Sequence, residues 1–456
     1  MKTILFLLIT FLTSCSMNAQ DITGQWNGIL KTQGIQLRVV FHINKTDSGY
    51  SSTMDSPDQK VKGLPATSTT FENSKLKIES KISGFEYDGD FKENAITGIL
   101  KQGGQEFPLN LSRGQIESQP IKRPQEPIKP YPYYSEEVTF KNNMADVTLA
   151  GTLTLPKKEG IYPVVILITG SGPQNRDEEI LGHKLFLVIS DYLTRNGIAV
   201  LRYDDRGVAQ STGDFKTATT ADFATDVESA ISYLKTRKEI NRKKIGLIGH
   251  SEGGIIAPMV ASKSKDVDFI VLLAGQGLSG DKLMLLQKEK IEQAMHIDEK
   301  GISKEQEIFS GAYRIILESH KDDINLKNKL NTYFNQSFDN KLPEEQVNAI
   351  TNSITTPWII YFLKYNPVPT LEKVKCPVLA IDGDKDLQVP PENLIAIKTA
   401  LEKGGNKNVT TKLFPNLNHL FQDCKTGLPS EYSEIEETFS PAALDEITKW
   451  IKKQVD

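Results

Sequence analysis

The sequence predicts a small antiparallel β-domain, followed by a larger α/β domain with a doubly wound, mostly parallel sheet and a helical cap. Three observations predict this architecture. Apolar and polar residues alternate in the first quarter of the chain, which is typical of half-buried strands. Continuous apolar runs then alternate with helical stretches, as in parallel sheets, and a long charged segment with helical periodicity interrupts this second pattern.

The composition excludes several classes of protein. Among 456 residues, 38% are hydrophobic and 25% are charged, as in ordinary soluble globular proteins. The 54 basic and 58 acidic residues leave a formal charge of −4, and no long basic run occurs, so nucleic acid is not an expected partner. The three cysteines are too few for a disulfide-built scaffold. If Cys15 is lipidated, one bridge at most remains possible, between Cys376 and Cys424.

Residues 1–19 have the pattern of an export signal. Lys2 precedes an apolar run over residues 4–12, which is too short to span a membrane. The run ends in Leu-Thr-Ser-Cys at Cys15, which resembles the bacterial lipobox, where the cysteine is lipidated. The alternative is ordinary cleavage near Ala19. We therefore expect an exported protein, either a periplasmic or outer-membrane lipoprotein tethered through Cys15 or a secreted one; no later segment is long and apolar enough to span a membrane.

Residues 21–113 are expected to form the β-domain. Alternation is clearest over residues 35–43 and returns at residues 76–82 and 107–111, with Gly-, Asn-, Asp- and Ser-rich turns between the runs. The pattern favours an antiparallel sandwich or barrel. No catalytic constellation is present, so we interpret this domain as accessory. Residues 114–135 then contain five prolines, which predicts an extended linker or a strap over a surface.

The α/β domain is expected over residues 136–456. Its expected strands are residues 164–169, 198–203, 244–248, 267–274 and 377–381, with helices at residues 184–196 and 220–237. The helical, charged segment between the last two strands is too long for a loop, so we expect a helical cap at about residues 278–374.

A G-x-S-x-G motif occurs once, as Gly249-His250-Ser251-Glu252-Gly253 between an expected strand and an expected helix. This arrangement places a nucleophilic serine on a sharp turn, and Gly249 and Gly253 allow the backbones to approach closely. The backbone N–H of Glu252 is then expected to donate to an oxyanion. His250 is expected to be structural.

A nucleophilic serine needs a base and an acid, which follow it in the chain order Ser, acid, His in this type of site. Of the six histidines, only His419 lies beyond the strand 377–381. Asp386, in the loop after that strand, is the expected acid, and Asp384 is the second candidate. A calcium loop is excluded as an explanation of these aspartates, because leucine and asparagine stand where glycine and glutamate are required.

The second oxyanion donor is expected in the loop over residues 169–177, from the backbone N–H of Ser171. A dinucleotide fingerprint is the competing interpretation of Gly170-Ser171-Gly172. It is disfavoured because Asn175 replaces the third glycine and Pro173 removes a backbone donor. No metal or organic cofactor is expected.

From about residue 135 onward, the chain resembles the α/β-hydrolase superfamily, in particular exported bacterial esterases close to the dienelactone-hydrolase and serine-aminopeptidase-like branches. The matching segments are residues 170–177, 202–207 and 249–254, Gly383 with Asp386, and Asn418-His419. Many relatives have His-Gly where this chain has Thr169-Gly170. The resemblance implies that Asp205 and Arg206 have an architectural role. The β-domain also resembles a domain that is often found ahead of such exported esterases.

The resemblance implies hydrolysis of a small carboxylic ester through an acyl-enzyme. His419, oriented by Asp386, would remove the proton of Ser251. The alternative is an exported serine peptidase of the aminopeptidase or prolyl type on the same fold. A third possibility, a binding protein with a degenerate hydrolase domain, is disfavoured by the complete set of Ser, Asp and His. The sequence does not select the acyl or the alcohol group.

Overall fold

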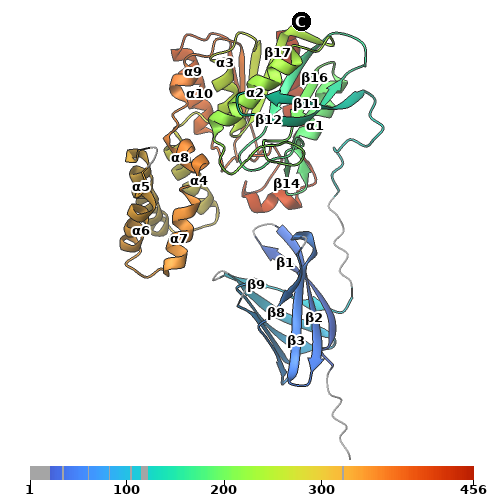
Figure 1. The fold of residues 1–456 in the computed structure, drawn as a ribbon, viewed down its shortest axis with the longest axis vertical. Coiled ribbons are helices and arrows are strands. Elements are labelled where there is room, and N and C mark those ends of the chain that lie inside the picture. Colours follow the sequence, from blue (N-terminus) through green and yellow to red (C-terminus); the bar gives the residue numbers. More distant parts are fainter. Residues whose placement is uncertain are drawn as a thin grey trace, which may run out of the picture. The chain divides into compact units, whose positions relative to one another are not determined.

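The computed structural model describes residues 21–32, 35–59, 61–81, 83–102, 105–114, 122–320 and 323–456. Its chain forms two compact units, Met1–Pro120 and Ile121–Asp456, and the expected linker at residues 114–135 spans their boundary (Figure 1). The expected export signal with Cys15 lies outside the described residues. In the described part of the chain, no helix is both long and apolar enough to cross a bilayer.

The first unit is one antiparallel sheet with the order β4-β3-β2-β1-β10-β8-β7-β6-β5 and with β9 paired to β8. Its strands are β1 Gly24–Thr32, β2 Ile35–Thr46, β3 Gly49–Ser56, β4 Val61–Pro65, β5 Ser68–Glu72, β6 Lys75–Ser80, β7 Phe85–Lys92, β8 Ala95–Gln102, β9 Gln105–Pro108 and β10 Leu111–Ser112. The sheet is rolled, since the hydroxyls of Ser52 in β3 and Thr69 in β5 share a hydrogen bond of 2.7 Å. Trp26, Phe41 and Tyr87 are buried inside it. The predicted antiparallel β-domain is confirmed.

The second unit contains an eight-stranded sheet with the order β11-β12-β16-β13-β17-β18-β19-β20. The strands are β11 Tyr134–Asn142, β12 Val147–Leu155, β13 Tyr162–Ile168, β16 Ala199–Tyr203, β17 Ile240–His250, β18 Phe269–Leu273, β19 Val378–Gly383 and β20 Val409–Phe414. Strand β12 is antiparallel to both of its neighbours, and the strands from β16 to β20 are parallel. This is the topology of an α/β-hydrolase, as predicted.

Helices cover both faces of this sheet, because its buried strands are apolar on both sides. One apolar cluster joins the sheet to α2 Thr220–Leu234, α3 Gly253–Ala261 and α10 Glu392–Lys403. The other joins it to α1 Leu185–Arg195 and α11 Pro441–Val455. Cys376 and Cys424 are free thiols, so the structure has no bridge between them.

The cap is inserted between β18 and β19, and Figure 1 shows its helices α4 to α8. Its helices are α4 Gly280–Ala294, α5 Glu299–Glu318, α6 Leu326–Ser337, α7 Glu344–Ser353, α8 Pro357–Lys364 and α9 Val368–Leu371. The cap has an apolar core of its own around Leu330 and Phe334. Helix α8 begins at a proline, and Thr356 caps it by accepting a hydrogen bond from the N–H of Ile359. A methyl group on Gly280 would lie 1.8 Å from the carbonyl oxygen of Phe362, so α4 and α8 are in close contact.

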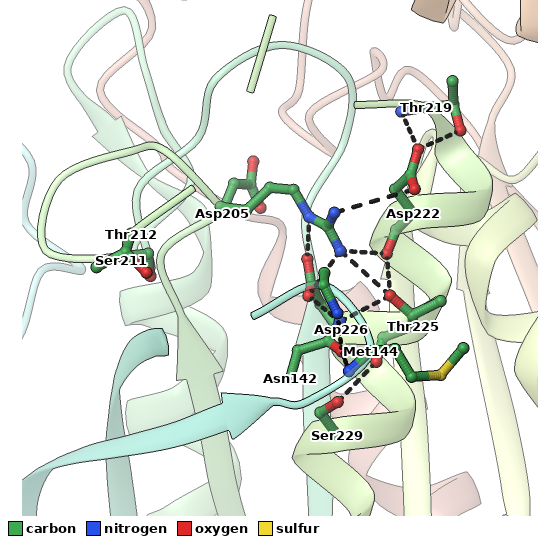
Figure 2. A network of polar contacts seen from close by, with 12 residues as sticks. Asn142, Met144, Asp205, Ser211, Thr212, Thr219, Asp222, Thr225, Asp226 and Ser229 are labelled. Carbon is green, nitrogen blue, oxygen red and sulfur yellow. Dashed lines mark hydrogen bonds and ion pairs between the residues drawn. The ribbon is translucent and has the colours of Figure 1, made fainter. Parts of the chain in front are cut away.

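Arg206 holds the start of α2 against β11, which agrees with its expected architectural role. Its guanidinium donates to both carboxylate oxygens of Asp226, at 2.7 and 2.9 Å. The amide of Asn142 donates to the same carboxylate at 2.7 Å. Figure 2 shows Asn142, Asp222 and Asp226 within this polar network. The charge of Arg206 is thus paired inside the protein, as a buried charge requires.

Residues 122–133 pack onto the second unit before β11 begins. The guanidinium of Arg123 donates to the backbone carbonyls of Leu181, Gly182, Ser433 and Ile435. The side chain of Gln125 accepts from the N–H groups of residues 438 and 439 and donates to the carbonyl of residue 439. These contacts make this proline-rich segment a strap on the surface of the unit.

Candidate active site

Ser251 lies on a tight turn between the end of β17 and the start of α3. Its φ is +52°, a left-handed conformation that is strained for a residue with a side chain. The turn is held by a hydrogen bond from the N–H of Ser251 to the carbonyl of Leu273 at 2.9 Å. A methyl group on Gly249 would lie 2.0 Å from the carbonyl oxygen of Gly253, and one on Gly253 would lie 2.2 Å from that of Ile168. Only glycine fits at either position.

His419 and Asp386 form a buried pair. The Nδ1 atom of His419 lies 2.7 Å from Oδ2 of Asp386, whose Oδ1 accepts from the N–H groups of Gln388 and Val389 at 2.8 and 2.9 Å. Because an ionised carboxylate only accepts, Nδ1 carries the proton and Nε2 is free to act as a base. Asp384 instead accepts from the N–H of Asn416 at 2.6 Å and is exposed. The structure therefore brings Asp386, and not Asp384, to the histidine.

The carboxyl group of Asp382 is hydrogen-bonded to that of Asp386. Burial, together with the charge of Asp386 and a hydrogen bond to it, raises the pKa of Asp382 well above its ordinary value. Asp382 therefore keeps its proton and can donate to Asp386 without adding a second charge. In the sequence, Asp382 is marked only by its position at the end of a buried strand. Because Asp384 and Asp386 lie in the same segment, this position alone does not reveal the role of Asp382.

The loop after β13 carries the expected oxyanion donors near the serine. A methyl group on Gly170 would lie 3.2 Å from Cβ of Ser251, so the loop passes beside the nucleophile. The N–H of Gly170 donates to Oε1 of Glu178 at 2.6 Å and is therefore occupied. Among the described residues, the N–H groups of Ser171 and Glu252 donate to no protein acceptor, and both residues line the same cavity as Ser251. These two groups remain available to an oxyanion.

The loop is fixed by Asp205, which lies two residues after the end of β16. Its carboxylate accepts from the hydroxyl of Thr169 at 2.7 Å and from the N–H of Gln174 at 3.0 Å. Burial raises the pKa of Asp205 well above its ordinary value, and the charges of Glu178 and Glu252 add to this effect. Asp205 thus positions the oxyanion loop through these two hydrogen bonds, which is the architectural role expected for it.

Glu178 and His250 connect the oxyanion loop, the nucleophile turn and the histidine loop. The Nδ1 atom of His250 lies 2.9 Å from Oε1 of Glu178, and its Nε2 lies 3.0 Å from the carbonyl oxygen of His419. Since both ring nitrogens face acceptors, His250 carries two protons and is positively charged. Burial lowers its pKa, but the charge and hydrogen bond of Glu178 outweigh burial, so the pKa of His250 is raised. Sequence reasoning missed Glu178, because no motif marks it.

A cavity of about 210 Å³ opens beside Ser251, between the nucleophile turn and the cap. Its lining residues are Ser171, Ser251, Glu252, Gln276, Leu283, Met284, Gln287, Trp358, Phe362, Gln388 and Val389. The cap contributes Leu283, Met284 and Gln287 from α4, and Trp358 and Phe362 from α8. The cavity is smaller than the roughly 300–1,000 Å³ pockets that hold drug-sized ligands, so it suits a short substrate group.

Comparisons with known proteins identify a family, several relatives and several solved structures that are similar to this chain. The family model described as X-Pro dipeptidyl-peptidase (S15 family) matches residues 132–419. Esterase EstD of Thermotoga maritima is 26% identical over 325 residues, which cover 71% of this chain and 70% of the relative. An uncharacterized 31.7 kDa protein of Escherichia coli is 25% identical over 263 residues, covering 56% of this chain and 84% of the relative.

Solved structures of low sequence identity also match. The esterase Pf2001 of Pyrococcus furiosus shares 15% identity at a TM-score of 0.44, with 71% of this chain and 92% of the other covered. The hypothetical protein PA2218 of Pseudomonas aeruginosa shares 15% identity at a TM-score of 0.45, with 75% and 98% covered.

Proposed function

The chain belongs to the X-Pro dipeptidyl-peptidase (S15) family, and from this premise we propose that it is a serine hydrolase that cleaves small carboxylic esters. The observation that carries the proposal is the arrangement of Ser251 on its strained turn, with the hydrogen-bonded pair of His419 and Asp386 and two unoccupied N–H donors around a small cavity. The match to an esterase across 71% of the chain supports the choice of esters.

The mechanism proceeds through an acyl-enzyme. Nε2 of His419 takes the hydroxyl proton of Ser251 while the serine oxygen bonds to the ester carbonyl carbon, and Asp386 stabilises the charge that forms on the imidazole. The N–H groups of Ser171 and Glu252 donate to the resulting oxyanion. The imidazolium then protonates the leaving alcohol, and water repeats the sequence to release the acid.

Hydrolysis of p-nitrophenyl esters of increasing acyl length tests this proposal. We expect turnover that is highest for short chains, because the cavity holds only about 210 Å³, and loss of turnover in Ser251→Ala. The variant Ser262→Ala is the matched control, because Ser262 lies at the far end of the helix that starts at the turn and does not line the cavity. Wild-type protein that cleaves none of the esters would reject the proposal.

The family match itself favours a second candidate, cleavage of dipeptides that end in proline from peptide N-termini. The same serine, histidine and aspartate would act on an amide. Comparing kcat/KM for Ala-Pro-p-nitroanilide and for p-nitrophenyl butyrate separates the two candidates. Peptide release as fast as ester release would make the peptidase the main activity.

We also propose that the protein is exported and tethered to a membrane through Cys15. The short apolar run and the Leu-Thr-Ser-Cys ending support this proposal, with plain secretion as the alternative. Fractionation of expressing cells tests it: the wild type should sediment with membranes and Cys15→Ala should not. Equal soluble fractions of the two proteins would favour plain signal cleavage.

A further inference from the structure

The side chain of Glu252 is an acid in the wall of the active-site cavity. The residue is only 4% exposed, yet it lines the cavity beside Ser251. A buried carboxyl group needs partners, and Glu252 has two: its Oε1 accepts from the hydroxyl of Thr220 at 2.6 Å and from the indole N–H of Trp358 at 2.7 Å. Both bonds reach the same oxygen. Among the described residues, no hydrogen bond reaches Oε2, which leaves this oxygen with acceptor capacity.

Two aromatic rings form the wall next to this acid. Trp358 and Phe362 lie one turn apart on α8, both line the cavity, and their rings stack with centroids 5.0 Å apart and an interplanar angle of 22°. The indole N–H holds the carboxyl of Glu252 against the edge of this stack. An aromatic wall together with a carboxylate is the chemistry that recognises an ammonium group.

The rest of the lining does not neutralise the acid. Besides Glu252, the residues around the cavity are serines, glutamines, aromatic residues and aliphatic residues, and no lysine, arginine or histidine is among those that the structure describes there. An anionic substrate would face Glu252 without a counter-charge, and a neutral one would leave Oε2 unpaired. A cationic substrate supplies the missing partner.

We propose that this cavity is a subsite for esters that carry an ammonium group, with Glu252 as counter-ion and with Trp358 and Phe362 as the aromatic wall. The inference rests on the proposed ester hydrolysis at Ser251, and it adds that the preferred ester substrate carries a positive charge. Glu252 then has two separate tasks: its backbone N–H faces the oxyanion, and its side chain selects the substrate.

The protonation state of Glu252 gives the subsite a pH signature. Burial raises the pKa of Glu252 to about 7, although the hydrogen bonds from Thr220 and Trp358 lower it. The other titratable groups that interact with it are Asp205, behind the nucleophile turn, and Tyr361 on α8. Burial raises the pKa of both groups, and neither a carboxyl group nor a phenol can supply a positive charge. The carboxylate therefore becomes available as the pH rises through about 7.

The test compares esters that differ only in charge, with the full-length protein. On the alcohol side, butyrylcholine is compared with its analogue in which carbon replaces the ammonium nitrogen. On the acyl side, the p-nitrophenyl ester of γ-butyrobetaine is compared with its carbon isostere. We expect kcat/KM for the cationic member of at least one pair to be roughly tenfold higher at about pH 8. This ratio should fall several-fold at about pH 6. The two pairs distinguish a subsite for the alcohol from one for the acyl group.

Variants connect the preference to the carboxylate. In Glu252→Gln the amide oxygen can still accept from Thr220 and Trp358, so the geometry is kept while the charge is removed. We expect the ratio to fall to about one and its dependence on pH to disappear. Glu318→Gln, which removes an exposed acid of the same cap, is the matched control and should keep the wild-type ratio.

Inhibition of the wild type provides a measurement that needs no variant. Tetramethylammonium should inhibit hydrolysis of the neutral ester competitively, whereas the same concentration of sodium should not. Ratios near one in both pairs, or an unchanged ratio in Glu252→Gln, would overturn the inference while neutral esters are still cleaved. Absence of hydrolysis of any ester would instead reject the proposed function.

Discussion

Replacing Asp386 with asparagine is expected to lower kcat about ten-thousandfold while the fold is kept. The structure determines how the new amide orients. Oδ1 of Asp386 accepts from two backbone N–H groups, of Gln388 and Val389, so the amide oxygen must take this position and the NH₂ group must face His419. The NH₂ group would then donate to Nδ1, and the ring proton would move to Nε2, where it prevents the histidine from accepting the serine proton.

The expected loss equals about 5.5 kcal/mol of transition-state stabilisation, at about 1.4 kcal/mol for each factor of ten. The assay is kcat for p-nitrophenyl butyrate, with thermal unfolding as the check on folding. Asp384→Asn is the matched control: asparagine can still accept from the N–H of Asn416, so kcat should change less than about threefold. An Asp386→Asn variant within tenfold of the wild type, or a larger loss in Asp384→Asn, would refute the assignment of the acid.

Three further predictions follow from packing and charge. Gly170→Ala should lower kcat ten- to a hundredfold with little change in thermal stability, because its methyl group would lie 3.2 Å from Cβ of the serine and from Oε1 of Glu178; kinetics and Tm measured together check this. Arg206→Met should lower the free energy of unfolding in urea by about 3–5 kcal/mol, because it leaves Asp226 buried without its cation; an unchanged midpoint would contradict this reasoning. The raised pKa of His250 stabilises the fold fully below its ordinary pKa of about 6.5, and this contribution is lost as the pH rises through the folded-state value. Tm should therefore decline on the alkaline side in the wild type, and less so in Glu178→Gln.

Much of the fold was predictable because local patterns determine it. Buried parallel strands are continuous apolar runs, and β13, β17 and β19 overlap the expected ranges, with differences of a few residues at their ends. The cap was predictable as a helical insertion, because no loop of that length fits between neighbouring strands. The pairing of the strands and the rolled shape of the first unit depend on contacts between residues far apart in sequence, such as Ser52 and Thr69, for which no local pattern exists.

The candidate site divides in the same way. Ser251, Asp386 and His419 follow motifs and a fixed chain order, and the structure places the aspartate against the histidine as this order implies. Glu178 and Trp358 have no such signal. Glu178 reaches His250 across 72 positions, and Trp358 reaches Glu252 across 106 positions. Side chains of this kind are determined by tertiary packing, which a single sequence does not reveal.

The strap at residues 122–133 decides how the two units can be separated in the laboratory. A truncated protein that starts at Ser135 would lose Arg123 and Gln125, and with them the donors to five backbone carbonyl groups of the unit. Impaired hydrolysis by such a fragment could therefore result from the loss of the Arg123 and Gln125 contacts alone, so it would not show that the β-domain is needed. A fragment that starts at Ile121 keeps these contacts. Comparing the two fragments therefore separates the contribution of a few anchored residues from that of an entire domain.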